Sequence, residues 1–275
     1  MPSPRPGTLH VVATPIGHRD DIGARAVETL RKVAVIAAED TRHTRPLLQH
    51  LGIDTPLVAL HDHNERTAVD GLVERMREGA DVALVSDAGT PLISDPGFRL
   101  VRAARAAGLK VSPVPGPSAV IAALSVAGLP SDRFIFEGFL AAKAGARRAR
   151  LTELAGESRT LIFYESSHRI VECLQDMREI FGADRAAVVA RELTKLFETV
   201  LDAPLDDLVR QVSADPNQQK GEFVVMVAGR PAGEDERLAE GRRVFAILKD
   251  ELAPAKAAKL AAAITGAPRK ALYGT

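Results

Sequence analysis

The segment 86–97, SDAGTPLISDPG, carries more backbone constraints than a simple connection needs. It follows a short apolar run and holds two aspartates, two prolines and two glycines. Proline pushes the preceding residue toward an extended backbone, so the segment is predicted to be a stiff ledge whose amides need partners outside a helix. Asp87 could accept hydrogen bonds from a ligand, and Leu92 and Ile93 could contact a flat apolar face. The equally favoured alternative is a rigid turn in which Asp95 caps the next helix.

The ends of other predicted strands carry the same kinds of residue. Glycine, proline, serine or charged residues follow strands at TPIG (14–17), PGPSAV (115–120), YESSHR (164–169) and RELTK (191–195). Loops at the carboxyl ends of parallel strands line the crevice in which α/β sheets bind ligands, so these segments and the ledge together predict one composite pocket. Each segment alone is weak, because proline and glycine are ordinary turn residues.

Several common catalytic and cofactor motifs are absent from the sequence. No two glycines are separated by a single residue, which excludes the glycine-rich dinucleotide fingerprint, and no Gly-Lys pair occurs as in a P-loop. The zinc-protease pattern HExxH and the nucleophile elbow GxSxG are also absent. The nearest approach to a metal cluster, HDHN at 61–64, is predicted to be a solvated turn, so no metal site is expected. Cys173 is predicted to be a small core residue.

The composition is that of a folded protein in a reducing compartment. Hydrophobic residues make up 46% of the 275, which is enough for a sizeable core. A single cysteine excludes an intrachain disulfide and fits a cytoplasmic location. The 36 basic and 36 acidic residues cancel, so bulk charge does not favour nucleic acid, although local patches still can. The apolar runs are too short to span a bilayer and the N-terminus lacks a signal peptide's apolar stretch, so no membrane association is expected.

Strand-like and helix-like stretches alternate through the first half of the chain, which predicts a mostly parallel sheet covered by helices. After about residue 130 strands are more frequent and less regularly spaced, which predicts a second α/β lobe with a mixed sheet. The polar stretch 230–237 is interpreted as a linker before a short helical tail. The expected domains are residues 1–130, 131–230 and 231–275, in a fold of the α/β class. The expected strands are 9–13, 34–39, 56–60, 81–86, 110–115, 133–139, 160–165, 186–192, 197–203 and 221–229.

Helices are expected between most of these strands and in the tail. Pro46 is predicted to lie in the first turn of a helix over 43–51, and Pro254 and Gly266 are predicted to bound a helix of the tail. The other expected helices are 23–33, 64–79, 97–108, 116–128, 145–156, 166–181 and 204–213.

Eight segments in order resemble the tetrapyrrole-methylase-like superfamily: TPIGHRDDI, AEDTRHT, SDAGTPLISDPG, PGPSAVIAAL, EGFL, LIFYESSHR, RELTK and KGEFV. Within it they closely resemble the ribosomal RNA small subunit methyltransferase I family, which methylates a cytidine ribose 2′-hydroxyl in 16S ribosomal RNA. The resemblance covers about residues 9–229 and the tail. The occurrence of so many segments in the right order is highly specific for this family. One departure is His18, where the family is expected to have asparagine.

The resemblance implies two α/β lobes of the tetrapyrrole-methylase type with bent S-adenosylmethionine in the cleft between them. It also implies a homodimer that acts on 16S ribosomal RNA or the small ribosomal subunit. The ledge would offer backbone groups to the methionine end of the cofactor. The cofactor contacts implied by the motifs are Pro15, Ile16, Gly17, Asp87, Gly89, Thr90, Ile93, Ser94, Ser118, Ala119, Tyr164, Ala190 and the backbone near Gly221.

A neutral ribose hydroxyl is a poor nucleophile, so a base or strong orientation is expected to assist its in-line attack on the methyl carbon. Glu165 or Asp40 is predicted to lie near this nucleophile, and Arg42, Arg191 and Lys195 are predicted to hold RNA or favour the deprotonated hydroxyl. The alternative is that these residues form ion pairs at the lobe edge. The other carboxylates near predicted strand ends are Asp20, Asp21, Glu39, Glu192 and Glu198.

A basic segment, KAGARRAR at 143–150, is a candidate for contact with RNA phosphates in view of the resemblance. The alternative is a solvated helix face, which is the commoner fate of a charge run. Arg269 and Lys270 in the tail could belong to a small helical module that binds RNA or another subunit.

Two other functions stay open. A methyltransferase of the same fold that acts on a tetrapyrrole, such as uroporphyrinogen or a precorrin, usually carries a first loop of the form GxGPGDP. The corresponding segment here is TPIGHRDDI, which favours RNA. A non-catalytic RNA-binding or cofactor-sensing module would explain the basic segment but not five coordinated loops at strand ends.

Overall fold

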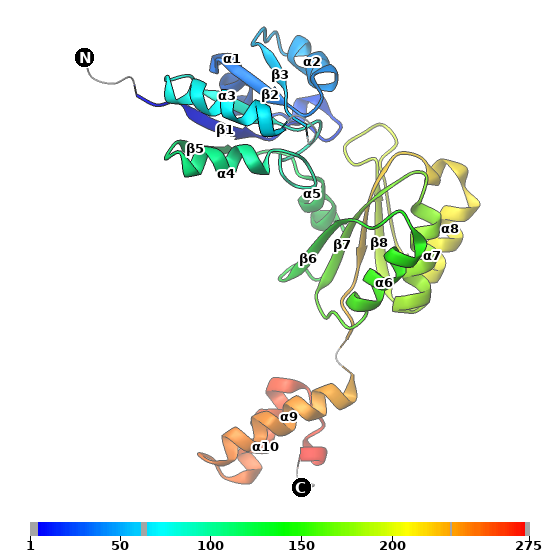
Figure 1. Ribbon diagram of the computed structural model, residues 1–275. Helices are drawn as coiled ribbons and strands as arrows, with labels where there is room; N and C mark the ends of the chain where they lie inside the picture. The colour runs from blue at the N-terminus through cyan, green and yellow to red at the C-terminus, as the bar shows by residue number, and fades with distance from the viewer. Residues whose placement is uncertain (1–4, 62–64, 232, 273–275) are drawn as a thin grey trace. The chain divides into compact units, whose positions relative to one another are not determined.

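The computed structural model describes residues 5–61, 65–231 and 233–272, and the chain divides into two compact units. The first unit comprises Met1–Ala155 and Thr160–Ala228, and the second comprises Gly156–Arg159 and Gly229–Thr275. Two five-stranded sheets with helices on their faces form the first unit, whereas the second is helical (Figure 1). The predicted fold class, two α/β lobes and a helical tail, is confirmed.

The first sheet is parallel throughout, in the order β3-β2-β4-β1-β5. Its central strands β2 and β4 are completely buried runs of small and branched residues, because helices cover both faces. Helices α1 and α2 pack on one face, and α3 and α4 on the other. The strands are β1 (Thr8–Val12), β2 (Val35–Ala38), β3 (Leu57–Ala59), β4 (Val82–Val85) and β5 (Lys110–Val114). The helices are α1 (Ala24–Lys32), α2 (Thr41–His50), α3 (Glu65–Arg77) and α4 (Phe98–Ala106), with a 3-10 turn at Arg19–Asp21.

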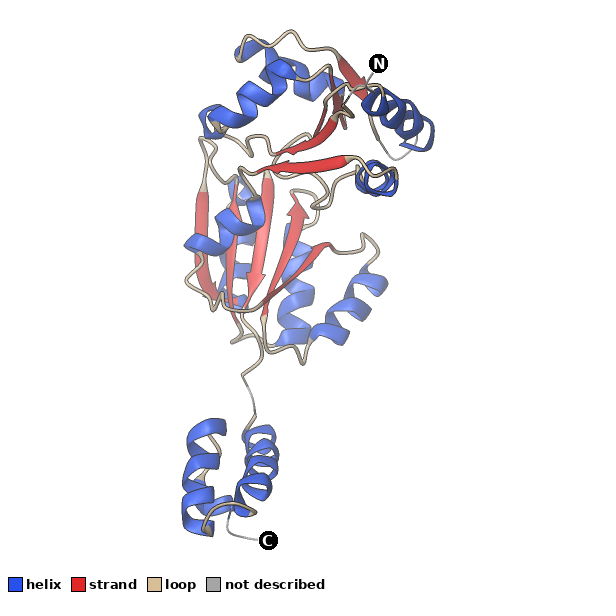
Figure 2. Ribbon diagram, turned by 90° about the vertical axis from the view of Figure 1, so that its left-hand side faces the viewer, coloured by secondary structure: helices blue, strands red, loops and turns tan. Residues whose placement is uncertain are grey.

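The second sheet is mixed, in the order β6-β7-β10-β8-β9 (Figure 2). Only β6 and β7 run parallel, and the other neighbours are antiparallel. Helices α6, α7 and α8 bury one face of this sheet. The strands are β6 (Phe134–Phe139), β7 (Thr160–Ser166), β8 (Ala186–Arg191), β9 (Thr199–Pro204) and β10 (Glu222–Val227). The helices are α6 (Ala144–Leu154), α7 (Ile170–Phe181) and α8 (Leu205–Ala214), with a 3-10 turn at Pro216–Gln219.

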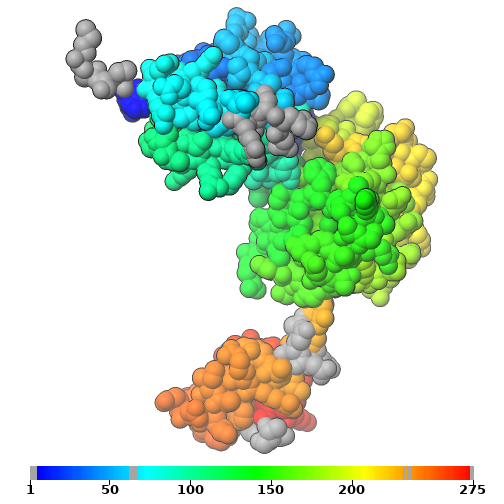
Figure 3. Space-filling model, viewed as in Figure 1, coloured from blue at the N-terminus to red at the C-terminus, as the bar shows by residue number. Residues whose placement is uncertain are grey.

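Helix α5 (Ala119–Val126) follows the last strand of the first sheet but packs on the open face of the second. Its buried residues Val120 and Ala123 join a cluster with Ile162, Val224 and Met226 of the second sheet. The two lobes are in direct contact in the space-filling view, the first in blue to cyan-green and the second in green to yellow (Figure 3). The loop that leads into α5 therefore lies where the lobes meet.

The N-termini of two helices differ from the predictions. Asp40 Oδ1 accepts the Arg42 amide hydrogen at 2.8 Å, so α2 begins at Thr41 and Pro46 lies in mid-helix rather than in its first turn. Asp95 does not cap α4, whose N-cap is Gly97 with φ 116°.

The second unit contains α9 (Glu234–Lys249), α10 (Pro254–Thr265) and a 3-10 turn at Arg269–Leu272. The predicted linker 230–237 is shorter than expected, because α9 already begins at Glu234. Helix α10 starts at Pro254 and ends before the left-handed Gly266, as predicted. None of the helices in the described ranges combines the length and apolarity that a membrane span requires.

Candidate functional site

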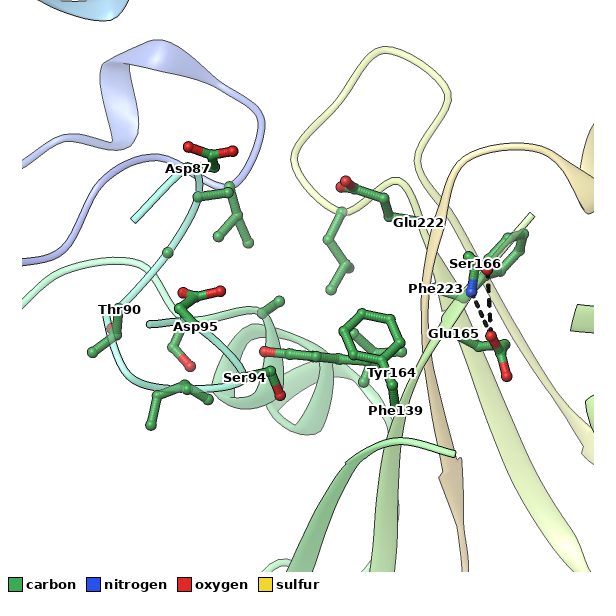
Figure 4. A pocket seen from close by; sticks show the side chains of 18 of the residues that line it. Asp87, Thr90, Ser94, Asp95, Phe139, Tyr164, Glu165, Ser166, Glu222 and Phe223 are labelled. Carbon is green, nitrogen blue, oxygen red and sulfur yellow. Dashed lines mark hydrogen bonds between the residues drawn. The ribbon is translucent and has the colours of Figure 1, made fainter. Parts of the chain in front are cut away.

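A cavity of about 350 Å³ opens where the carboxyl ends of the first sheet face the second sheet and α5 (Figure 4). The family resemblance implied thirteen cofactor-binding residues, and the cavity brings most of them together. Those that line it are Ile16, Asp87, Gly89, Thr90, Ile93, Ser94, Ser118, Ala119, Tyr164 and Ala190. Pro15, Gly17 and Gly221 are not part of the lining. The sequence had not assigned Ala88, Asp95, Phe139, Ser166, Leu193, Glu222, Phe223 or Val224, which line the cavity as well.

The ledge, residues 86–97, forms one wall of the cavity and has an unusual backbone. Leu92 and Ser94 adopt left-handed conformations, with φ 75° and 70°. Residues other than glycine rarely adopt a left-handed backbone conformation, and those that do are concentrated at functional sites. Ser94 also lies close to the second lobe, because a Cβ on Gly138 would come within 3.1 Å of its hydroxyl oxygen.

Hydrogen bonds hold the ledge to both neighbouring loops. Thr14 and Gly89 exchange backbone hydrogen bonds, Thr14 N to Gly89 O at 2.9 Å and the reverse at 3.1 Å. The Thr90 hydroxyl donates to the Pro117 carbonyl at 2.9 Å. The loops after β1, β4 and β5 are therefore one connected structure, as the composite pocket predicted from the sequence requires.

The loop 192–198 reaches across from the second lobe and also has a strained backbone, with φ 50° at Glu192 and 63° at Thr194. The His18 amide donates to the Thr194 hydroxyl at 3.0 Å. Gly17 packs so closely here that a Cβ would come within 2.6 Å of Thr194 and Lys195 side-chain atoms. Gly17 therefore acts through close packing rather than by lining the cavity. The His18 ring, at the position where asparagine was expected, accepts from the Asp20 amide and caps a 3-10 turn.

Lys195 is the cation in the cavity wall among the described residues, and two carboxylates hold it. Its Nζ lies 2.8 Å from Glu192 Oε1 and 2.8 Å from Glu222 Oε2. Glu192 Oε1 also accepts the Glu222 amide hydrogen at 3.0 Å. A Cβ on Gly221, which has φ 99°, would come within 2.6 Å of the Glu192 side chain. Gly221 therefore leaves room for the carboxylate that positions Lys195.

The structure does not fit the predicted RNA contact of Arg191. Its side chain is buried, its Nε donates to the Lys220 carbonyl at 2.6 Å, and its Nη1 donates to the Phe197 carbonyl at 2.8 Å. The bond to Phe197 joins the start of the loop 192–198 to its end, and the bond to Lys220 joins it to the segment before β10. The guanidinium is used for loop structure and is not presented to a phosphate.

Glu165 is likewise not placed to act as a base. Its side chain has no exposed surface, and its Oε1 accepts from the Ser166 amide at 2.8 Å and forms an ion pair with Arg169 Nη2 at 2.7 Å. Figure 4 shows its carboxylate turned away from Tyr164 and toward the far side of the strand. Arg169 in turn donates to the Leu140 carbonyl at 3.1 Å. The pair therefore connects the YESSHR and EGFL loops.

Asp40 and Arg42 line a second hollow of about 440 Å³, which shares Glu39 and Asp87 with the main cavity. Their side chains form the ion pair that was the alternative to a catalytic role, with Nη2 and Oδ2 2.6 Å apart. The hydrogen bond from Arg42 holds the pKa of Asp40 well below its usual range, so this carboxylate is a poor proton acceptor. Arg42 keeps an exposed side chain at the rim.

Asp87 connects the two hollows. Its Oδ1 accepts the Asp40 amide hydrogen at 3.1 Å, and its Oδ2 lies 2.9 Å from Nδ1 of His43. The hydrogen bond to Asp87 raises the pKa of His43 above its ordinary value. The sequence motif AEDTRHT contained His43, but no spacing rule pointed to its pairing with a residue 44 positions later.

The three arginines of the basic segment 143–150 pair with acidic side chains. Arg147 is 2% exposed and its Nε lies 2.6 Å from Asp176 Oδ2. Arg148 pairs with Asp176 and Glu179, and Arg150 pairs with Glu137 and Glu153. These contacts favour the ion-paired helix face over a phosphate-binding segment. Three of the four HDHN residues, 62–64, lie outside the described residues.

Two family models match the chain. The model for tetrapyrrole (corrin/porphyrin) methylases matches residues 8–209, which contain the cavity's ledge and most of its walls. The model for the RsmI C-terminal HTH domain matches residues 235–274, which include α10 and all of α9 except its first residue.

The chain is similar over nearly its whole length to proteins named ribosomal RNA small subunit methyltransferase I. It is 66% identical to the one from Xylella fastidiosa (strain Temecula1) over 269 residues, which cover 98% of each chain. It is 60% identical to the one from Pseudomonas aeruginosa over 269 residues, which cover 97% of this chain and 95% of the relative. The X-ray structure of a cobalt precorrin-4 methyltransferase shares the fold, with a TM-score of 0.59 and 19% identity over 80% of this chain and 94% of that one.

Proposed function

Because this chain belongs to the tetrapyrrole methylase family, and within it to the ribosomal RNA small subunit methyltransferase I family, we propose that it methylates small-subunit ribosomal RNA with S-adenosylmethionine as donor. The acceptor in this proposal is the ribose 2′-hydroxyl of a cytidine in 16S ribosomal RNA, and the acting form is a homodimer. The observation that carries the proposal is the cavity walled by the ledge, which offers a site for a donor without any glycine-rich dinucleotide loop.

The cavity has the size and the charge that this donor needs. Its volume of about 350 Å³ is within the usual range for small-molecule sites. Ile16, Ile93, Ala119 and Ala190 supply apolar surface for a nucleoside. Carboxylates outnumber cations in the wall, and Lys195 is already paired, which suits a ligand with a net positive charge. The residues present therefore fit S-adenosylmethionine.

When bound, S-adenosylmethionine supplies an electrophilic methyl group on a sulfonium. The work of this chain is then to hold the reacting atoms in line and to exclude water. Backbone groups of the ledge from Gly89 to Ser94 would hold the polar end of the donor. Ser118 at the start of α5, whose hydroxyl makes no capping bond, would assist them. Positioning of this kind can lower a barrier by roughly 7–11 kcal/mol.

We assign the acceptor nucleotide to the second hollow, which meets the donor cavity at Glu39 and Asp87. Arg42, exposed at its rim, is suited to a phosphate. His43 does not line the hollow itself, but Asp87, which does, orients its ring. His43 is the proposed proton acceptor for the ribose hydroxyl, because Asp40 and Glu165 are engaged in other contacts. The carboxylate holds Nδ1, which leaves Nε2 of an exposed ring for the substrate.

The test uses donor carrying a labelled methyl group and small subunits from cells that lack this gene. Mass spectrometry of nuclease digests should find one label on a cytidine ribose. Label on an added tetrapyrrole instead of RNA, or RNA binding without methyl transfer, would contradict the proposal and support one of the two alternatives.

The proton acceptor is tested on the same helix. His43→Asn should lower kcat about 100-fold, in the usual range for loss of general-base catalysis. His50→Asn, an exposed histidine at the other end of α2, is the matched control. Equal rates for the two variants would exclude His43 from the reaction.

A further inference from the structure

Asp95 is a cavity carboxylate that neither the predicted motifs nor the proposed mechanism uses. It lies in the ledge between the left-handed Ser94 and Pro96, and Figure 4 shows its side chain on the cavity side, facing the part of the wall that holds Tyr164. Within the described part of the chain, no lysine, arginine or histidine forms an ion pair with it. A half-buried carboxylate without a cation is costly, so its position calls for a ligand that supplies the positive charge.

The surroundings of Asp95 make it keep its proton to a higher pH than an exposed aspartate would. Burial is the main cause that raises its pKa to about 6, and the charge of Asp87 adds to this, whereas a hydrogen bond with Ser86 acts in the opposite direction. The other titratable side chains in the wall are Glu39, Tyr164, Lys195 and Glu222. Glu165 also lines the cavity, but its carboxylate is turned away from Tyr164 and pairs with Arg169. Lys195 is held by Glu192 and Glu222 and is not available to Asp95.

The donor and the product of the proposed reaction differ by one methyl group and one charge. S-Adenosylmethionine carries a sulfonium, whereas S-adenosylhomocysteine carries a neutral thioether, and their ammonium, carboxylate and adenosine groups are the same. A carboxylate in a partly desolvated cavity attracts a cation far more strongly than a neutral sulfur. We propose that Asp95 faces the sulfonium and distinguishes the methyl donor from the demethylated product by charge. This inference rests on the proposed function and adds no step to the methyl transfer.

A consequence is that proton linkage differs between the two ligands. Donor binding should drive Asp95 to its ionised form and release a proton below about pH 6, so donor affinity should rise with pH. Product binding leaves Asp95 free to stay protonated, so product affinity should not rise with pH. The cavity therefore binds donor in preference to product at neutral pH, which assists product release.

Isothermal titration calorimetry with each ligand, in buffers of different ionisation enthalpy, tests the inference. If only ionised Asp95 accepts the donor, its affinity should increase about fourfold from pH 5.5 to pH 7.5, as linkage to a group with a pKa near 6 requires. Asp95→Asn should weaken donor binding and abolish its pH dependence while leaving product affinity nearly unchanged. Asp132→Asn, which removes an exposed carboxylate that does not line the cavity, should keep the pH dependence.

Three results would overturn the inference. Equal pH dependence for donor and product would mean that Asp95 faces their common ammonium group. A pH dependence that persists in Asp95→Asn would assign it to another residue, and thermal unfolding of the variant would establish that it is folded. If neither ligand bound to the wild-type protein at any pH, the donor site itself would be wrong and the proposed function would fail with it.

Discussion

Tyr164 and Glu165 are consecutive residues of β7 whose side chains lie on opposite faces of the second sheet. Tyr164 packs with the α5 cluster and lines the cavity, and burial raises its pKa to about 12. Glu165 lies on the other face, close to Cys173 of α7. Burial is the main cause that raises the pKa of Cys173, and the charge of Glu165 adds to it. The alternation of side chains along a strand therefore separates the ring of Tyr164, which packs against α5 at the cavity, from the carboxylate of Glu165, which supports the loop behind the strand.

We expect Glu165→Gln to reduce stability more than catalysis. Loss of the charge weakens the bonds from Arg169 and Ser166, which should cost about 2 kcal/mol, as is usual for hydrogen bonds to charged groups. Urea unfolding measures the loss, and methyl transfer at a temperature where the variant is folded should show a nearly unchanged kcat. If the variant were as stable as the wild type but transferred methyl groups about 100-fold more slowly, Glu165 would be assigned the role of a base.

Arg147→Ala should destabilise the second lobe without affecting contact with RNA. Its guanidinium is buried against Asp176, and removing one partner of a buried pair typically costs about 3–5 kcal/mol. Arg150→Ala, on the same helix but with a guanidinium that is about half exposed, should cost less than Arg147→Ala. Urea unfolding compares the two variants, and the salt dependence of RNA binding should stay that of the wild type for Arg147→Ala. Equal destabilisation, or a shallower salt slope for Arg147→Ala, would contradict this assignment.

Much of the fold was accessible from periodicity and turn residues. All ten predicted strands are present with ends shifted by a few residues, because buried apolar runs bounded by glycine and proline leave little choice. The packing of α5 was not accessible. Its sequence AVIAALSV is apolar on nearly every side, so no pattern indicates which sheet it covers.

The loops of the site could be predicted because they are recognisable sequence motifs. The directions of its side chains depend on backbone φ angles that the sequence does not indicate. Left-handed φ at Leu92 and Ser94 could not be predicted, since non-glycine residues rarely adopt it, and Asp95 was therefore considered only as a helix cap. The direction of the Glu165 side chain, by contrast, could be predicted from the sequence. If Tyr164 faces the cavity, strand alternation already requires its neighbour to face away.

The pKa of His43 should depend on Asp87. The hydrogen bond to this carboxylate raises the pKa of His43 above its ordinary value, so the pair stabilises the fold at low pH and the contribution is lost as the pH rises through the raised pKa. In Asp87→Asn the midpoint of the His43 titration, followed by NMR, should move down toward about 6.5. An unchanged midpoint would mean that the pair does not exist in solution.

Asp95→Asn should raise thermal stability at pH 8 and not at pH 4. The pKa of Asp95 is about 6 in the folded chain and about 4 when unfolded, so the folded state binds more protons between these values and stability falls as the pH rises through them. Above this window the wild type holds a half-buried charge that the variant lacks. Melting temperatures of both proteins at the two pH values provide the test, and the pH effects of all other groups cancel in the difference. A variant that is less stable at pH 8 would contradict the assigned burial cost.

Gly221→Ala should loosen the loop 192–198 and weaken donor binding. A Cβ at φ 99° is strained, which costs about 1–3 kcal/mol, and it would displace the Glu192 carboxylate that holds Lys195 in the cavity wall. Donor affinity measured by calorimetry should fall about tenfold, in proportion to about 1.4 kcal/mol of lost positioning. Gly71→Ala is the matched control, because this exposed glycine inside α3 has open space around it and should gain about 0.5–1 kcal/mol of stability with unchanged donor affinity. If Gly221→Ala bound the donor as well as the control does, the loop would have no part in the site.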